Sequence, residues 1–250
     1  MACFFVCLLI NKNRLILELI KFMRGIIIYL FKGLLVFIFA IQFSYAGGIL
    51  VGRTRVIYHA DKKEASLPLS NKSEVNPYLI QSWIDSSDGK TRGPFVVTPP
   101  LFRLNAQEDN SLRISYTAGN LPKDRESVFY INIRAIPSTP KNDKNELTLV
   151  VKTRIKLFYR PEGMQGNASD AYKLLTFSRS NGQLRISNPS PYHVVFSFLT
   201  VGNSALKNVE MVAPKSQLIV ELPKDNIGNS VEWSAINDYG GDTASMKQVL

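Results

Sequence analysis

The sequence predicts an all-β protein. The chain carries many short runs of Val, Ile, Tyr, Phe and Thr, and Asn, Asp, Gly, Ser and Pro interrupt these runs about every ten residues. After residue 46 it has no long apolar stripe at the 3.6-residue period of a helix. A chain of 250 residues that is 45% hydrophobic can bury the core of one large or two ordinary domains.

Residues 1–46 differ from the rest because they are strongly apolar, with scattered basic residues. Met23 and Arg24 begin a short basic region, residues 33–43 form an apolar core, and Ser44-Tyr45-Ala46 puts small residues at the two positions that a signal peptidase reads. This order predicts a secretory signal.

We therefore expect export and cleavage after Ala46. Residues 1–22 are unusual for a signal, which suggests the hypothesis that translation starts at Met23. A membrane anchor over residues 25–43 is the alternative, but Lys32 interrupts that stretch and the cleavage motif follows it directly.

The first predicted domain covers residues 47–160. Its turns are spaced as in an immunoglobulin-like β-sandwich. The candidate strands are residues 53–58, 64–69, 78–84, 95–98, 101–104, 111–116, 128–135 and 147–159.

The second predicted domain covers residues 161–250. It begins with a connector at residues 162–167 and has enough strands for a smaller sandwich. The candidate strands are residues 176–178, 183–187, 194–201, 209–212, 216–222 and 231–236. We expect two immunoglobulin-like β-sandwich domains at an angle, with an interdomain cleft.

Charge and cysteine content restrict the partners and the source of stability. The net charge is +10, but acids are interspersed with the basic residues and no run of five Lys or Arg occurs, so a nucleic-acid partner is not expected. Both cysteines, Cys3 and Cys7, lie in the leader, so the exported protein has no disulfide and depends on packing.

Enzymatic motifs are absent from the sequence. The chain has only two histidines, His59 and His193, and it lacks the H-E-x-x-H, G-x-S-x-G and phosphate-binding glycine patterns and any cluster with the spacing of a metal site. We expect no catalytic residues, no metal and no cofactor.

A strand in residues 145–161 has the pattern of a sheet edge that another chain can use. Leu147, Leu149 and Val151 share one face, and neither face is uniformly charged. An ordinary half-buried strand is the alternative.

Several motifs together resemble the periplasmic pilus (fimbrial) chaperones of Gram-negative bacteria. Their order and spacing cover nearly all of the exported chain, although each alone is weak. The motifs are RTRV at residues 53–56, NPYLIQSWI at 76–84, TPPLFRL at 98–104, LPKDRESVFY at 121–130, IRAIP at 133–137, IKLFYRP at 155–161 and INDYG at 236–240.

The resemblance implies donor-strand complementation, a form of β-augmentation in which the chaperone lends a strand to a pilin subunit that lacks one. By matching position, Leu147, Leu149 and Val151 are the residues inserted into the subunit's groove. The implied partners are pilin subunits and an outer-membrane usher. Whether the free chaperone caps its strand as a dimer is left open.

The resemblance also implies two groups of charged residues. Arg55 and Lys156 match the positions that anchor the subunit's C-terminal carboxylate in the cleft, and Glu126, Arg160 and Asp238 match a structural charge network between the domains. Without the resemblance all five would be interpreted as surface charges.

Residue parity raises one geometric question. Lys156 is even-numbered and the three apolar residues are odd-numbered, so an undistorted strand points them to opposite faces. We expect a bulge, a strong twist or a reach around the edge to bring Lys156 into the cleft.

The link at residues 136–145 is short and polar. It resembles the short-loop branch of the family, which implies adhesive rod-like pili. The alternative function is an immunoglobulin-like surface adhesin or structural subunit, which has no need for the Arg55 and Lys156 pair.

Overall fold

The computed structural model describes residues 23–25, 27, 30–33, 47–117, 119–138, 147–223 and 228–250. The chain divides into two compact units, residues 1–46 and residues 47–250. In the described part of the first unit the residues are helical, and no helix there or elsewhere in the described ranges is long and apolar enough to cross a membrane. The predicted cleavage site at residues 44–46, the apolar residues 34–43 and both cysteines lie outside the described residues.

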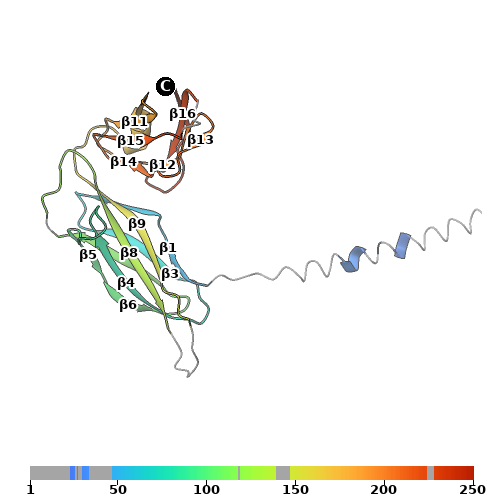
Figure 1. Cartoon of the computed structure of the whole chain (residues 1–250). Helices are drawn as coiled ribbons and strands as arrows, with labels where there is room; N and C mark the ends of the chain where they lie inside the picture. Colours follow the sequence, from blue (N-terminus) through green and yellow to red (C-terminus); the bar gives the residue numbers. More distant parts are fainter. Residues whose placement is uncertain are drawn as a thin grey trace, which may run out of the picture. The chain divides into compact units, whose positions relative to one another are not determined.

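The first β-sandwich is formed by two sheets (Figure 1). One sheet is antiparallel, in the order β1-β3-β7-β5. Its strands are β1 (Ile49–Val51), β3 (Ala65–Asn71), β7 (Asp109–Tyr116) and β5 (Phe95–Thr98).

The second sheet has the order β2-β9-β8-β4-β6. β2 runs parallel to β9, and the other neighbours are antiparallel. Its strands are β2 (Arg55–His59), β9 (Val151–Arg160), β8 (Ser127–Pro137), β4 (Tyr78–Asp85) and β6 (Leu101–Leu104).

The core of this sandwich follows from the two-residue period of its strands. Ile131 and Ile133 of β8 are buried, as are Leu112 and Ile114 of β7 in the facing sheet, and all four belong to one apolar cluster. Burying each of these side chains contributes about 1.5–3 kcal/mol, so the alternating pattern holds the two sheets together.

The second β-sandwich has its own core, in which Trp233 packs on Phe177 and donates its ring N–H to the carbonyl of Tyr172. One sheet has the order β10-β11-β15, and the other has the order β13-β12-β16-β17 with β14 paired to β12. Its elements are the 3-10 helix η1 (Ala168–Leu174), β10 (Thr176–Ser180), β11 (Gln183–Asn188), β12 (Val194–Val201), β13 (Ser204–Ala205), β14 (Met211–Val212), β15 (Ser216–Glu221), β16 (Ser230–Ala235) and β17 (Met246–Val249).

The predicted all-β class and the two immunoglobulin-like sandwiches are confirmed, and every predicted strand overlaps an observed one. The sequence missed β1, β13, β17 and η1, which are short or polar.

The prediction of a strand over residues 147–150 is wrong, because β9 begins at Val151. The pairing of β9 with β8 ends at Val151 and Ala135. In the same register residue 149 would face Pro137, which has no N–H to donate, so the ladder stops there.

Candidate functional site

Arg55 and Lys156 are neighbours across two paired strands. In the parallel pairing of β2 with β9, Arg55 is the direct partner of Lys156. Paired strands lie about 4.8 Å apart, so two cations that are far apart in sequence stand side by side in one sheet.

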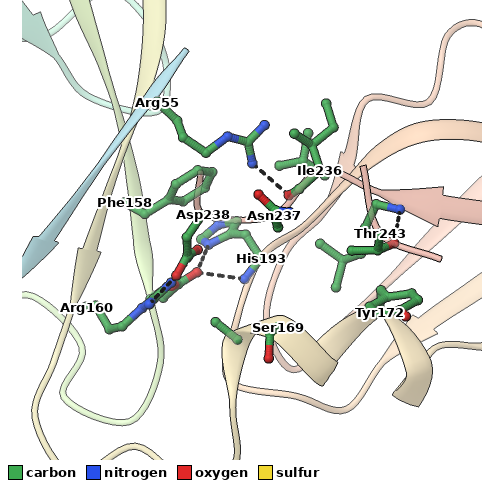
Figure 2. A pocket seen from close by; sticks show the side chains of 15 residues that line it. Arg55, Phe158, Arg160, Ser169, Tyr172, His193, Ile236, Asn237, Asp238 and Thr243 are labelled. Carbon is green, nitrogen blue, oxygen red and sulfur yellow. Dashed lines mark hydrogen bonds and ion pairs between the residues drawn. The ribbon is translucent and has the colours of Figure 1, made fainter. Parts of the chain in front are cut away.

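Arg55 is a buried cation with unused hydrogen-bonding capacity. It points from β2 toward the second sandwich, and its Nη1 donates to the carbonyl of Ile236 at 3.0 Å (Figure 2). Its Nε is buried and meets no acceptor among the described residues. Burial lowers the pKa of Arg55, and the charge of Asp238 partly offsets that effect. A guanidinium is a donor group that binds carboxylates well, but the buried Nε is itself out of reach of an incoming anion.

Lys156 is paired with an acid of the second sandwich. Its ammonium contacts the carboxylate of Glu210, and the side chain of Lys156 is only 15% exposed while that of Glu210 is 67% exposed. The main chain at Glu210 is fixed, because its carbonyl accepts a hydrogen bond from the N–H of Phe196 at 3.0 Å.

A second charged cluster is centred on Arg160. Its Nη1 and Nη2 donate to the two carboxylate oxygens of Asp238 at 2.8 and 3.0 Å, and its Nε donates to Glu126 at 2.8 Å. The other oxygen of Glu126 accepts from the main-chain N–H of His193 at 2.8 Å. Burial by itself lowers the pKa of Arg160, but the hydrogen bonds and charges of Asp238 and Glu126 outweigh it and raise that pKa. Arg160 therefore stays charged and joins residues of both sandwiches.

Asp238 is presented by a tight turn at residues 237–241. The side chain of Asn237 accepts from the N–H groups of Tyr239 and Gly241 at 3.0 and 3.1 Å. Gly240 has a φ of +89°, and a Cβ atom there would lie 2.3 Å from the hydroxyl of Thr54. Only glycine fits this position without strain, so the turn lies directly against the residue that precedes β2.

The two faces of β9 have different environments. Its odd-numbered residues Ile155 and Leu157 contact the core of the first sandwich. On the even face, Phe158 packs on the ring of His193, with ring centroids 5.3 Å apart, beside the contacts of Lys156 and Arg160 described above.

A bulge, one of the three expected ways of bringing Lys156 into the cleft, is not present in the pairing of β9 with β8. The pairing of β9 with β8 runs without a register shift from Val151 to Tyr159. Lys156 and Val151 point to opposite faces because the strand is regularly pleated. Lys156 meets the second sandwich because that sandwich packs against the even face of the strand.

Leu147, Leu149 and Val151 are exposed, as is Val150. The three odd-numbered residues have the same parity as the residues that are buried further along β9. Val151 is the last residue paired with β8, and Leu147 and Leu149 lie beyond the end of that pairing. The main chain at Leu147 and Leu149 has no strand partner in the described part of the chain.

A groove of about 300 Å³ lies beside Arg55. Residues 51–55 line one side of it and Asp238 and Tyr239 line the other. Tyr239 is almost fully exposed. Among the described residues no group of three or more His, Cys, Asp or Glu side chains could hold a metal ion.

Comparison with known families covers both sandwiches. Residues 48–165 match the family described as "Pili and flagellar-assembly chaperone, PapD N-terminal domain", and residues 170–247 match "Pili assembly chaperone PapD, C-terminal domain". The chain belongs to the PapD family of pilus assembly chaperones. Members of this family are chaperones, so the protein is not an enzyme.

Individual relatives of this chaperone match over most of their length. It is 43% identical over 203 residues to the chaperone protein LpfB of Salmonella typhimurium, which covers 80% of this chain and 88% of LpfB. Its structure is similar to one chain of the solved complex of the Salmonella enterica SafA pilin with the SafB chaperone. The TM-score is 0.75 and the identity is 33%, and the match covers 81% of this chain and 96% of that chain. The periplasmic chaperone SfaE matches with a TM-score of 0.71, 37% identity and coverage of 81% and 100%.

The geometry of this chaperone brings together the charged residues that the sequence singled out. Arg55 stands beside Lys156, and Arg160 contacts both Glu126 and Asp238. The sequence did not single out Glu210, which lay in a predicted strand with no signal that it meets Lys156. Only tertiary structure brings these two residues together.

Proposed function

We propose that this chaperone binds pilin subunits in the periplasm by donor-strand complementation, keeps them from aggregating and delivers them to an outer-membrane usher. The observation that carries the proposal is the arrangement along residues 147–156, where an exposed apolar stripe leads into Lys156, the strand partner of Arg55. Among its relatives, the SafB chaperone occurs in complex with the SafA pilin.

The exposed stripe of Leu147, Leu149 and Val151 supports the strand-donating role. A pilin that lacks a strand exposes an apolar groove and unpaired backbone groups, both of which favour aggregation. A segment with free N–H and C=O groups and alternating apolar side chains can supply both missing contacts. Its main-chain bonds carry no sequence information, so one chaperone can serve several subunits.

Arg55 and Lys156 support a carboxylate anchor for the end of the subunit. A terminal carboxylate is a small fixed anion with two oxygens, and the site offers an ammonium beside a guanidinium. Partial burial of both cations strengthens their interaction with an anion relative to bulk water.

We assign Glu126, Arg160 and Asp238 a structural role. Their charges are satisfied within the chain, since Arg160 uses its hydrogen bonds on the two acids. They therefore hold the residues around the anchor and are not free to bind a subunit.

The remaining parts of the proposal concern organisation. Residues 1–46 are a leader removed on export, residues 47–160 form the subunit-binding sandwich, and residues 161–250 form the second sandwich. The short link before β9 supports membership of the short-loop branch.

The test is purification of the chaperone from periplasm, with bound proteins identified by mass spectrometry. Wild type is expected to carry a protein that its sequence identifies as a pilin, and Lys156→Ala is expected to lose it. Lys247→Ala, which removes an exposed lysine of β17, is the matched control. Equal recovery with Lys156→Ala would refute the anchor, and a wild type without any pilin would favour the adhesin alternative.

A further inference from the structure

The cation proposed to anchor the subunit already holds a carboxylate of its own chain. Glu210 of the second sandwich contacts the ammonium of Lys156, the direct strand neighbour of Arg55. The incoming terminal carboxylate and the Glu210 side chain carry the same functional group and the same charge. They therefore compete for one ammonium.

We propose that Glu210 is a displaceable internal carboxylate that makes the anchor selective for a carboxylate carried on a donor-strand substrate. This inference rests on the proposed function of Lys156. It assigns Glu210 as a specificity-determining residue, since a free anion must overcome the Glu210 contact without help from any other interaction.

The exposures of the two partners decide which one can leave. The side chain of Lys156 is 15% exposed, so it has little room to turn toward solvent, whereas that of Glu210 is 67% exposed. The main chain at Glu210 is fixed by the hydrogen bond from Phe196. Displacement therefore needs only rotation of one solvated side chain, with no movement of the strand.

Two carboxylates cannot share this site at low cost. Like charges a few ångströms apart repel each other, and the effect is stronger where water is partly excluded. In the described part of the chain the carboxylate of Glu210 contacts Lys156 and not Arg55, whose Nη1 donates to the carbonyl of Ile236. Arg55 lines a groove, and an incoming carboxylate that contacts its guanidinium as well as Lys156 gains a contact that Glu210 does not make in the described part of the chain.

A subunit segment has a further advantage over a free anion. Its main chain pairs with the free edge beyond β9, and its apolar groove covers the exposed stripe. This raises the effective concentration of its carboxylate at Lys156, so it can displace Glu210 where a dissolved anion cannot.

The experiment measures binding of two forms of one peptide to the full exported chain. The probe copies about fifteen C-terminal residues of the pilin recovered with wild type, made as the free acid and as the C-terminal amide, a length that spans roughly 50 Å when extended. The variants are Glu210→Gln, Lys156→Ala, the double variant, and the control Glu221→Gln. Glu221 of β15 accepts a hydrogen bond from Gln183 and has no cation as partner among the described residues.

We expect Glu210→Gln to bind the free acid about two- to fivefold more tightly than wild type, as for removal of one partly exposed charge contact. Binding of the amide should not change, and Glu221→Gln should behave as wild type. In the double variant the gain should vanish, because Glu210 acts through Lys156.

The outcomes separate the two hypotheses. If Lys156→Ala weakens binding of the free acid but Glu210→Gln leaves it unchanged, the anchor stands and the role of Glu210 is refuted. An equal gain for acid and amide would also refute it, since the gain would not concern the carboxylate. If wild type binds acid and amide equally, or recovers no pilin, both proposals fail. Equal thermal melting of Glu210→Gln and wild type checks that folding is unaffected.

Discussion

Replacement of Leu149 by alanine tests whether the exposed stripe donates apolar contacts to a subunit. The side chain of Leu149 is 72% exposed, so it contributes little to the free chaperone and has most of its surface left to bury. The change removes three carbons, worth about 0.8 kcal/mol each when fully buried, or about 2.4 kcal/mol in total. Scaled by the exposed fraction, the loss on binding is about 1.7 kcal/mol, which corresponds to about a 20-fold weaker complex.

The assay has two readouts, the dissociation constant for the co-purified pilin and the melting temperature of the free chaperone. Leu174→Ala is the matched control, because Leu174 of η1 is an exposed leucine (53%) that lies in the second sandwich. We expect Leu149→Ala to bind about 20-fold more weakly with an unchanged melting temperature, and Leu174→Ala to bind as wild type. If Leu149→Ala binds as tightly as its control, or loses binding only in proportion to lost stability, the reasoning is wrong.

Two further predictions concern the charged contacts. Arg160→Ala leaves Glu126, whose side chain is 3% exposed, without its cation. We expect the free energy of unfolding in urea to fall by about 2–4 kcal/mol, and by less for Arg160→Lys. An unchanged unfolding midpoint would contradict a structural role for this network. The pKa of Asp124 lies well below its ordinary value because Arg125, and then Lys215, donate to its carboxylate. A lowered folded-state pKa stabilises the fold above the unfolded pKa of about 3.9 and loses that contribution as the pH falls. An NMR titration of Asp124 should therefore show no midpoint near pH 4 in wild type and a higher midpoint in Lys215→Ala; the same midpoint in both would exclude the contact.

The fold was predictable because its strands follow strong local patterns. β5, β6 and β12 have the predicted bounds, since each is an apolar run limited by turn residues. The start of β9 was not predictable from its own residues. It depends on where β8 lacks an N–H group to pair with, which is at Pro137. Pro137 is not among the sequence neighbours of Val151, so the pattern around Val151 does not indicate this end.

The candidate site was predictable only in part. A lone arginine and a lone lysine carry no signal in this chain with 30 basic residues, so the pairing of Arg55 with Lys156 came from resemblance and not from pattern. Glu210 shows the limit of that approach. It meets Lys156 through packing between the two sandwiches, and neither spacing nor composition records such a contact.

The parity of β9 explains how one strand can serve both proposed contacts. Because side chains alternate, the odd residues supply the core and the exposed stripe, while the even residues supply Lys156 and the contacts with the second sandwich. Val151 and Lys156 are five residues apart on an unbroken ladder, a separation of about 17 Å. In the proposed function this distance sets the register. Once the terminal carboxylate is bound at Lys156, the position of the subunit strand along the stripe is fixed. A slip by one residue would turn the stripe away from the groove, so the anchor contributes correct register as well as affinity.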